Sequence, residues 1–389
     1  MQRLASLLCA TCLAALAGCS SSPGRSSHGF YPIGIYLLNS TNDYETVKSA
    51  GFNLVVGSAD GACLNAARAA GLRVLAAPNA SAGPEFNSSA ARKAVKDYDR
   101  HPALWAWYLV DEPDLNAVPP QQVLQAQQCL KAARASKPTV LTLYRGYEAL
   151  HYANLADITM IDRYPIPWLP LANFGQHVTL ARLAVAKDKP LLAVIQAFDW
   201  GAYPEMLPGE EHLRPPTYQE LRCLTYEALA RGANGLFFCA FDNGRWKIRE
   251  HPETWAALKA VVTEVNERLP LFLAQPQWWA RNHKFGDPAH RFNAALESSV
   301  TSTLLRVGIG NDLVQPGDYI LAVNNTERVH EYSFDLPLKR RLQSPGSEAR
   351  GARVQTLVPV LGERRSLTPE SGRLTDAFQP YAVHVYGPF

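Results

Sequence analysis

Leu104-Trp105-Ala106-Trp107-Tyr108-Leu109-Val110-Asp111-Glu112-Pro113-Asp114 is the segment from which the fold of this chain is best predicted. Its first part is entirely apolar or aromatic, which is typical of a strand buried on both faces of a sheet. Asp111 and Glu112 end that run, and Pro113 cannot continue the pairing of a central strand. In α/β proteins, ligands bind where parallel strands end at their carboxyl edge. The stretch therefore predicts a strand that delivers carboxylates to a functional edge.

The sequence around this stretch alternates short apolar runs with helix-like segments. The runs cover residues 33–38, 53–56, 73–77, 104–110, 139–143, 158–162, 191–196 and 235–241. The clearest helix is 217–231, where Thr217 and Glu220 have capping-box spacing and Gly232 follows the end. Eight strand–helix units with short connections predict a closed (β/α)8 TIM barrel. An open doubly wound sheet is the alternative, but it rarely needs eight equal units.

The pattern changes after Pro270. Short β-branched or aromatic runs at 304–308, 319–324, 330–334, 353–358 and 381–386 are separated by Gly, Pro and Asn. This pattern predicts a small all-β sandwich packed on the barrel. We expect residues 30–270 to form the barrel and residues 271–389 the C-terminal β domain.

The N-terminus has the features of a secretory signal. A positive start is followed by an apolar run, residues 4–17, that is too short to span a bilayer. Leu16-Ala17-Gly18-Cys19 resembles the lipobox of bacterial lipoproteins, which implies cleavage before Cys19 and lipidation of its sulfur. We therefore expect a signal peptide over 1–18, a flexible tether over 19–29 and a lipid anchor in the bacterial cell envelope, on the outer membrane or cell surface. The alternative is a plain signal peptide that contains a cysteine.

Composition and motifs exclude several classes of function. The net charge of +3 is too small to indicate a nucleic-acid partner. Phosphate binding would need a glycine-rich turn before a helix, and a serine hydrolase would need a nucleophile elbow; neither pattern occurs. The cysteines and histidines lack the spacing of metal ligands, and we expect no metal or cofactor.

A closed barrel would gather the residues at its strand ends on one face. Carboxylates and aromatic rings dominate this set, and they suit sugars, whose C–H faces stack on rings while hydroxyls bind polar groups. We therefore expect a carbohydrate partner. The expected substrate-binding residues are Tyr36, Asp111, Tyr144, Tyr164, Gln196, Asp199, Trp200 and Trp246, and Trp168 is a further candidate for stacking.

Hydrolysis of a glycosidic bond takes two carboxyl groups, and Glu112 is the first candidate for the proton donor. In a regular strand Asp111 and Glu112 point to opposite sides, so only one faces the barrel axis. An apolar wall and neighbouring carboxylates would raise the pKa of an inward Glu112, as a general acid needs. The alternative is that the two acids cap the next segment or pair with Arg145 or Arg163.

Several motifs together resemble the clan A glycoside hydrolases. His101-Pro102-Ala103-Leu104, followed by 108–113, is similar to the fourth barrel strand of that clan, where the acid/base Glu precedes Pro. Residues 214–220 and 232–236 resemble the seventh helix and eighth strand of barrels related to family 42, and residues 319–325 and 381–386 resemble their trailing β domain. The resemblance implies a glycosidase with Glu112 as acid.

The sequence departs from this resemblance at two positions, and the first is Asp111, which stands where the clan usually carries Asn before the acid/base Glu. Gln196 ends the seventh strand, where the family carries a nucleophilic Glu, and an amide cannot attack as that nucleophile. Asp162 and Asp242, which directly end strands, are the preferred second carboxylates; Asp199 or Glu205 is a further possibility. Alternatively, the barrel has lost hydrolysis and only binds glycans, or it is a structural envelope protein whose edge aromatics are buried.

Overall fold

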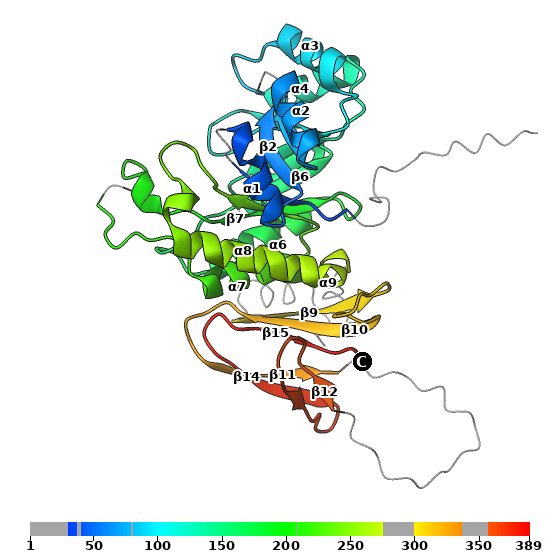
Figure 1. The fold of residues 1–389 in the computed structure, drawn as a ribbon, viewed down its shortest axis with the longest axis vertical. Helices are drawn as coiled ribbons and strands as arrows, with labels where there is room; N and C mark the ends of the chain where they lie inside the picture. Colours follow the sequence, from blue (N-terminus) through cyan, green and yellow to red (C-terminus); the bar gives the residue numbers. More distant parts are fainter. Residues whose placement is uncertain (1–29, 37–39, 79–80, 208, 275–298, 337–356) are drawn as a thin grey trace, which may run out of the picture. The chain divides into compact units, whose positions relative to one another are not determined.

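A closed barrel of parallel strands forms the first part of the structure, a computed structural model that describes residues 30–36, 40–78, 81–207, 209–274, 299–336 and 357–389. Each strand pairs with the next in sequence, and the last pairs back to the first. This arrangement confirms the predicted (β/α)8 barrel (Figure 1). The strands are β1 (Ile33–Ile35), β2 (Leu54–Ser58), β3 (Arg73–Ala77), β4 (Leu104–Val110), β5 (Thr139–Leu143), β6 (Ile158–Asp162), β7 (Leu191–Gln196) and β8 (Leu236–Cys239).

Helices follow the strands and cover the outside of the barrel. The predicted capping box at the start of α7 is present: the Thr217 hydroxyl accepts from the Glu220 amide, and the Glu220 carboxylate accepts from the Thr217 amide. Gly232, with φ of +91°, ends that helical segment as expected. The helices are α1 (Tyr44–Ser49), α2 (Gly61–Ala69), α3 (Ser88–Tyr98), α4 (Pro120–Ala132), α5 (Ala149–Tyr152), α6 (Ala172–Ala184), α7 (Tyr218–Ala230), α8 (Pro252–Glu267) and α9 (Leu269–Leu273).

Strand β4 is irregular in a way that its sequence does not reveal. Its register shifts against β3 between Val74 and Leu75, and against β5 between Tyr108 and Val110. Tyr108 packs in the buried cluster that fills the barrel, whereas Leu109 and Val110 both belong to the cluster beneath the helices. The strict alternation of side chains is therefore broken just before Asp111, as a β-bulge does.

The C-terminal strands form the predicted small β domain. Strands β9 (Val300–Val307), β10 (Gly317–Asn324) and β15 (Val383–Tyr386) make one antiparallel sheet, β11 (His330–Asp335) pairs with β14 (Arg373–Phe378), and β12 (Val358–Pro359) pairs with β13 (Ser366–Leu367). Side chains from all three sheets share one buried cluster, as in a sandwich. The predicted run 353–358 lies largely outside the described residues, and β13 and β14 were not predicted.

A buried ion pair joins the barrel to the β domain. Glu227 and Arg231 lie on α7 with side chains 0% and 3% exposed, and their closest N–O distance is 2.8 Å. Thr301 of β9 donates to Glu227 at 2.9 Å and accepts from Arg231 at 2.8 Å. A Cβ at position 175 of α6 would lie 2.3 Å from the Glu227 carboxylate, so the glycine there permits this contact. The two parts of the chain therefore meet through specific polar contacts.

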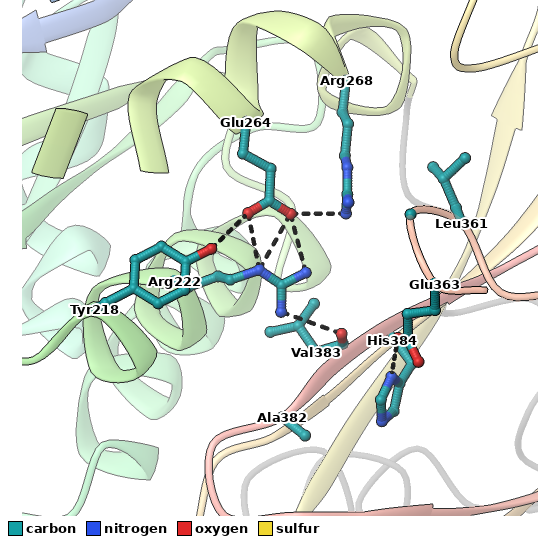
Figure 2. A pocket seen from close by; sticks show the side chains of 10 residues that line it. Tyr218, Arg222, Glu264, Arg268, Leu361, Glu363, Ala382, Val383 and His384 are labelled. Carbon is teal, nitrogen blue, oxygen red and sulfur yellow. Dashed lines mark hydrogen bonds and ion pairs between the residues drawn. The ribbon is translucent and has the colours of Figure 1, made fainter. Parts of the chain in front are cut away.

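A cavity of about 340 Å³ lies at the same junction, between α7, α8 and the β domain. Figure 2 shows that its charged groups already bind one another. Arg222 contacts Glu264 at 2.9 Å and donates to the Val383 carbonyl at 3.2 Å, and His384 binds Glu363 at 2.5 Å. None of the predicted site residues lines this cavity.

The N-terminal predictions concern residues outside the described part of the chain. Cys19, the signal segment 1–18 and the tether 19–29 all fall there. Among the described residues, no helix combines the length and apolar character that crossing a bilayer requires.

Candidate functional site

The end of β4 brings Asp111 and Glu112 to the carboxyl edge of the barrel. Glu112 has a φ of +44°, a left-handed backbone conformation that is uncommon for a residue with a side chain. Its amide donates to the Thr142 carbonyl of β5 at 3.1 Å, which holds this conformation in place. In a regular strand, Asp111 and Glu112 would point to opposite sides of the sheet. The bulge in β4 and the left-handed conformation of Glu112 interrupt this alternation.

The Tyr108 hydroxyl holds the Asp111 carboxylate, and two further hydroxyl groups inside the barrel hold Tyr108. Tyr108 donates a short hydrogen bond to Asp111 and lies 2.6 Å from the Thr142 hydroxyl. Tyr36 of β1 completes the group, with its hydroxyl 2.9 Å from that of Tyr108 and 3.1 Å from that of Thr142. Asp111 is exposed as a residue, and its carboxylate is fixed by the hydrogen bond from Tyr108.

Glu112 and Asp162 form a hydrogen-bonded carboxyl pair. Asp162 ends β6, is 4% exposed and accepts from the Tyr164 hydroxyl at 3.3 Å. Its other oxygen, Oδ1, is buried and accepts no hydrogen bond from the described residues. Two carboxylates repel each other, so this contact requires that one of them carries a proton.

Burial raises the pKa of both carboxyl groups in this pair. Loss of water and then the charge of Asp111 raise the pKa of Glu112 to about 7, although the hydrogen bond from Asp162 opposes the rise. Burial, followed by the charges of Glu112 and Asp111, raises the pKa of Asp162 well above its usual range. Burial also raises the pKa of Asp111, while the Tyr108 hydroxyl works against that shift. Asp162 therefore holds the more tightly bound proton, and Glu112 gains or loses its proton near neutral pH.

Arg145 and Arg163, which lie near this edge, contact groups other than the Asp111 and Glu112 carboxylates. Asp114 accepts from the backbone amides of Tyr144 and Arg145, at 3.1 and 2.8 Å, and its carbonyl accepts from the Arg145 guanidinium at 2.8 Å. The Arg163 guanidinium lies 4.4 Å from the centre of the Tyr144 ring. Among the ion pairs within the described ranges, none includes Asp111 or Glu112. The alternative that these acids merely pair with Arg145 or Arg163 is therefore not what the geometry shows.

Gln196 lies in the core and is 0% exposed. Its amide oxygen accepts from the Ile166 amide at 2.9 Å, and its nitrogen donates to the Ile166 carbonyl at 2.8 Å and the Phe198 carbonyl at 3.2 Å. These bonds fasten the loop after β6 to the end of β7. The expected contact between Gln196 and a sugar hydroxyl has no geometric support, because its amide is buried and already bonded to backbone groups.

Trp246 and Asp242, predicted from the end of β8, lie in a turn. Trp246 is 2% exposed, donates to the Ala240 carbonyl at 3.2 Å and stacks on His251 at 4.0 Å. Its buried ring cannot offer a face to a sugar, so the predicted stacking role does not fit its position. Asp242 is half-buried and accepts from the Gly244 amide at 2.8 Å.

Rings from the loops after β6 and β7 form an aromatic group near the carboxyl pair. Tyr164, Phe198, Trp200 and Tyr203 contact one another edge-on, with centroids 4.9–6.3 Å apart. Tyr164 and Trp200 keep part of their surface open to solvent. This places two of the predicted stacking residues in one group, next to Asp162.

The remaining candidates follow β6 and β7 in loops. Asp199 caps the 3₁₀ helix at Trp200–Ala202 by accepting from the Gly201 amide at 2.7 Å. Trp168 is 38% exposed in the loop after β6. Glu205 is exposed and forms an ion pair with Arg245, which lowers the pKa of Glu205 to about 2.

Sequence reasoning missed Thr142 and Cys239 as members of the site. Thr142 was visible as a polar residue within the apolar run 139–143. The Cys239 thiol, at the end of β8, bonds to the Tyr164 hydroxyl and is close enough to respond to the charges of Asp162, Asp111 and Glu112. In the part of the chain that the structure covers, no group of His, Cys, Asp and Glu has the arrangement of a metal site.

Solved structures with a similar fold include several glycoside hydrolases. An α-amylase from Geobacillus thermoleovorans, complexed with acarbose, aligns with a TM-score of 0.53 at 8% identity, over 92% of this chain and 97% of that chain. A family 5 glycoside hydrolase from Bacteroides vulgatus aligns with a TM-score of 0.55 at 13% identity, over 92% and 89%. A third structure, described as a glycoside hydrolase, gives 0.55 at 14% identity over 92% of both chains. No protein-family model and no curated protein matches the sequence.

Proposed function

We propose that this protein is a glycosidase that hydrolyses a poly- or oligosaccharide, with Glu112 as general acid. The observation that carries the proposal is the position of Glu112, at the carboxyl edge of the barrel with a pKa raised to about 7. A general acid works best when its pKa lies near the working pH, because it is then protonated yet able to release the proton. The neighbouring rings of Tyr164 and Trp200 supply surfaces on which a sugar can stack.

Asp162 is the carboxyl group that supports Glu112 in this proposal. It keeps its own proton and donates a hydrogen bond to Glu112, which fixes the orientation of the acid. Tyr36, Asp111 and Tyr144 remain candidates for contact with the sugar. Asp199 and Asp242 lie further along the loops of β7 and β8, where they could bind sugar hydroxyls.

The direct test is a screen of the purified protein against poly- and oligosaccharides, with detection of new reducing ends. We expect product from at least one glycan class, and chromatography of that product identifies the linkage.

A second candidate function is glycan binding without cleavage, which is favoured by the amide Gln196 at the end of β7. That function would give heat of binding in calorimetry but no product from any glycan that binds.

The proposal predicts a specific pH dependence. The protonated form of Glu112 is the active form, so kcat/KM should be level below pH 7 and fall about tenfold per pH unit above the pKa near 7. Replacing Asp111 with Asn removes a charge that raises the pKa of Glu112, so this falling limb should move to lower pH. The measurement is kcat/KM from pH 4 to pH 10 for both proteins. A falling limb that stays at the same pH in Asp111→Asn would contradict this electrostatic account.

We also propose that Cys19 carries a lipid anchor that holds the protein in the bacterial cell envelope. The proposal is supported by the lipobox-like residues 16–19 and by the polar tether that follows them. Metabolic labelling with a fatty-acid analogue should mark the native protein and leave a Cys19→Ser variant unmarked.

A further inference from the structure

Two arginines lie together at the carboxyl edge of the barrel, on the loops that follow β5 and β6. The Arg163 guanidinium is 4.4 Å from the centre of the Tyr144 ring, and the Arg145 guanidinium is 5.7 Å from the same point. The two positive charges are therefore held close to each other and repel. Attraction to the face of the ring offsets only part of this repulsion.

Each guanidinium is oriented by one hydrogen bond and keeps further donors. Arg163 donates from Nε to the side-chain oxygen of Asn173 at 2.7 Å, and Arg145 donates from Nη1 to the Asp114 carbonyl at 2.8 Å. A guanidinium has more N–H groups than one such bond uses. Several arginines elsewhere in the barrel pair with glutamates. Across the described ranges of the chain, Arg145 and Arg163 form no ion pair, although both are only half-buried.

Helix α6 packs against both loops and adds no compensating charge. Its His177 accepts at Nδ1 from the Gly146 amide at 2.8 Å, which ties the loop after β5 to the helix. Burial, followed by the charges of Arg163 and Arg145, lowers the pKa of His177 to about 4. At neutral pH the imidazole is therefore uncharged, and the two arginines give this part of the edge its positive charge.

The two arginines adjoin the carboxyl groups of the proposed site. Arg163 directly follows Asp162 in the chain. The Asp114 carboxylate accepts from the Arg145 amide at 2.8 Å. Burial is the main cause of the raised pKa of Glu112, and the charge of Asp114 adds to it, so Asp114 lies between the acid and the arginines in its influence. A glycan that binds at Glu112 and extends over the loops after β5 and β6 meets these arginines.

The chemistry of this group matches an oxyanion. A guanidinium binds two oxygens of a carboxylate or a sulfate at once through parallel N–H groups, and an anion removes the repulsion between two such cations. Because Arg145 and Arg163 are already oriented, they lose little freedom on binding. Tyr147 is 47% exposed, with its ring 6.4 Å from that of His177, and it offers a face for the sugar that carries the anion.

We propose that Arg145 and Arg163 form a subsite for an acidic substituent, a carboxylate or a sulfate, on the glycan that binds at this edge. This inference rests on the proposed glycosidase function and deepens it by naming acidic glycans as the substrate class. It gives the two unpaired arginines a counter-charge that the described chain does not provide. The Tyr144 ring holds both guanidinium groups in place for this contact.

The test measures binding of small sugars by ligand-observed NMR. The probes are the methyl glycosides of glucuronate and galacturonate, the 6-sulfated counterparts, and the neutral parent glycosides. We expect either the uronates or the sulfated sugars to bind at least about tenfold more tightly than the neutral ones, because a charged acceptor strengthens each hydrogen bond. The class with the lower Kd identifies the substituent as a carboxylate or a sulfate.

Variants assign this preference to the arginines. Arg163→Gln should raise the Kd of the preferred acidic sugar about tenfold and leave that of the neutral sugar unchanged. Arg163→Lys keeps the charge but loses the planar fork, so it should recover only part of the loss. Arg92→Gln, at an exposed arginine on α3, is the matched control and should bind like the wild type. Circular dichroism verifies the fold, and Arg145→Gln is the second variant.

The outcomes separate this inference from the glycosidase proposal. Equal affinity for acidic and neutral sugars, or an acid preference that survives both Arg163→Gln and Arg145→Gln, would overturn the subsite. Product from neutral glycans in the screen would then leave the glycosidase function standing. An arginine-dependent acid preference without product from any glycan would instead overturn the glycosidase function and leave the subsite as part of a glycan-binding protein.

Discussion

Glu112→Gln should lower kcat/KM on the best glycan substrate by about 10²–10⁴-fold. Glutamine has nearly the same shape as glutamate, so the change removes the transferable proton and leaves the volume of the side chain almost unaltered. The loss should appear in kcat, because the proton is needed in the transition state and not for substrate binding. Steady-state kinetics of the two purified proteins at pH 6 measure the effect.

Two controls make this result specific. Glu45→Gln changes an exposed glutamate on α1 and should leave kcat/KM unchanged. Glu112→Gln should also lose the falling limb of the pH profile near 7, because the titrating acid is gone. A variant that keeps both wild-type turnover and this limb would show that another group donates the proton.

The second large effect concerns stability. Glu227→Gln should lower the free energy of unfolding by about 3–5 kcal/mol, because it leaves the Arg231 guanidinium buried without its counter-charge. Arg231 lies against Thr179 of α6 and Thr301 of β9, so the lost pairing weakens both the helix layer and the junction with the β domain. Equilibrium urea unfolding, followed by tryptophan fluorescence and by circular dichroism, measures the change.

The matched control for this prediction is the exposed pair of Glu205 and Arg245. Glu205→Gln breaks that pair on the surface, where water and salt screen the charges, and should leave the unfolding midpoint unchanged. Replacing both Glu227 and Arg231 with Met should recover part of the stability lost in Glu227→Gln, since no unpaired charge then remains buried. Equal midpoints for Glu227→Gln and wild type would show that the buried pair does not hold the junction.

The fold was predictable because it depends on repeating local patterns. Each barrel strand is a short apolar run, and the capping box at Thr217 and Glu220 marks the start of α7 in both the sequence and the structure. Strand β13 was not predicted because it is only two residues long, Ser366–Leu367. Strand β14 was not predicted because its exposed and buried residues alternate only weakly. Local sequence carries little signal for strands of that kind.

The site was predictable only in part, because side-chain direction depends on tertiary contacts. The carboxyl edge and the closeness of Glu112 to Asp162 follow from strand ends meeting in a barrel. The bulge at Tyr108–Val110 does not follow from the sequence, and it overturns the expectation that only one of Asp111 and Glu112 faces the site. Chain position predicts both Gln196 and Trp246 in the site, but Gln196 is buried at the end of β7 by its bonds to Ile166, and Trp246 is buried in the turn after β8.

Comparing the Glu112→Gln defect on two leaving groups shows whether Glu112 donates the proton. A dinitrophenyl leaving group departs without protonation, whereas the alcohol of a natural glycan needs a proton. With the same sugar in both substrates, Glu112→Gln should lose about 10²–10⁴-fold in kcat/KM on the natural linkage and less than about tenfold on the dinitrophenyl glycoside. Equal losses on the two substrates, or no loss on either, would contradict the assignment of Glu112 as the proton donor.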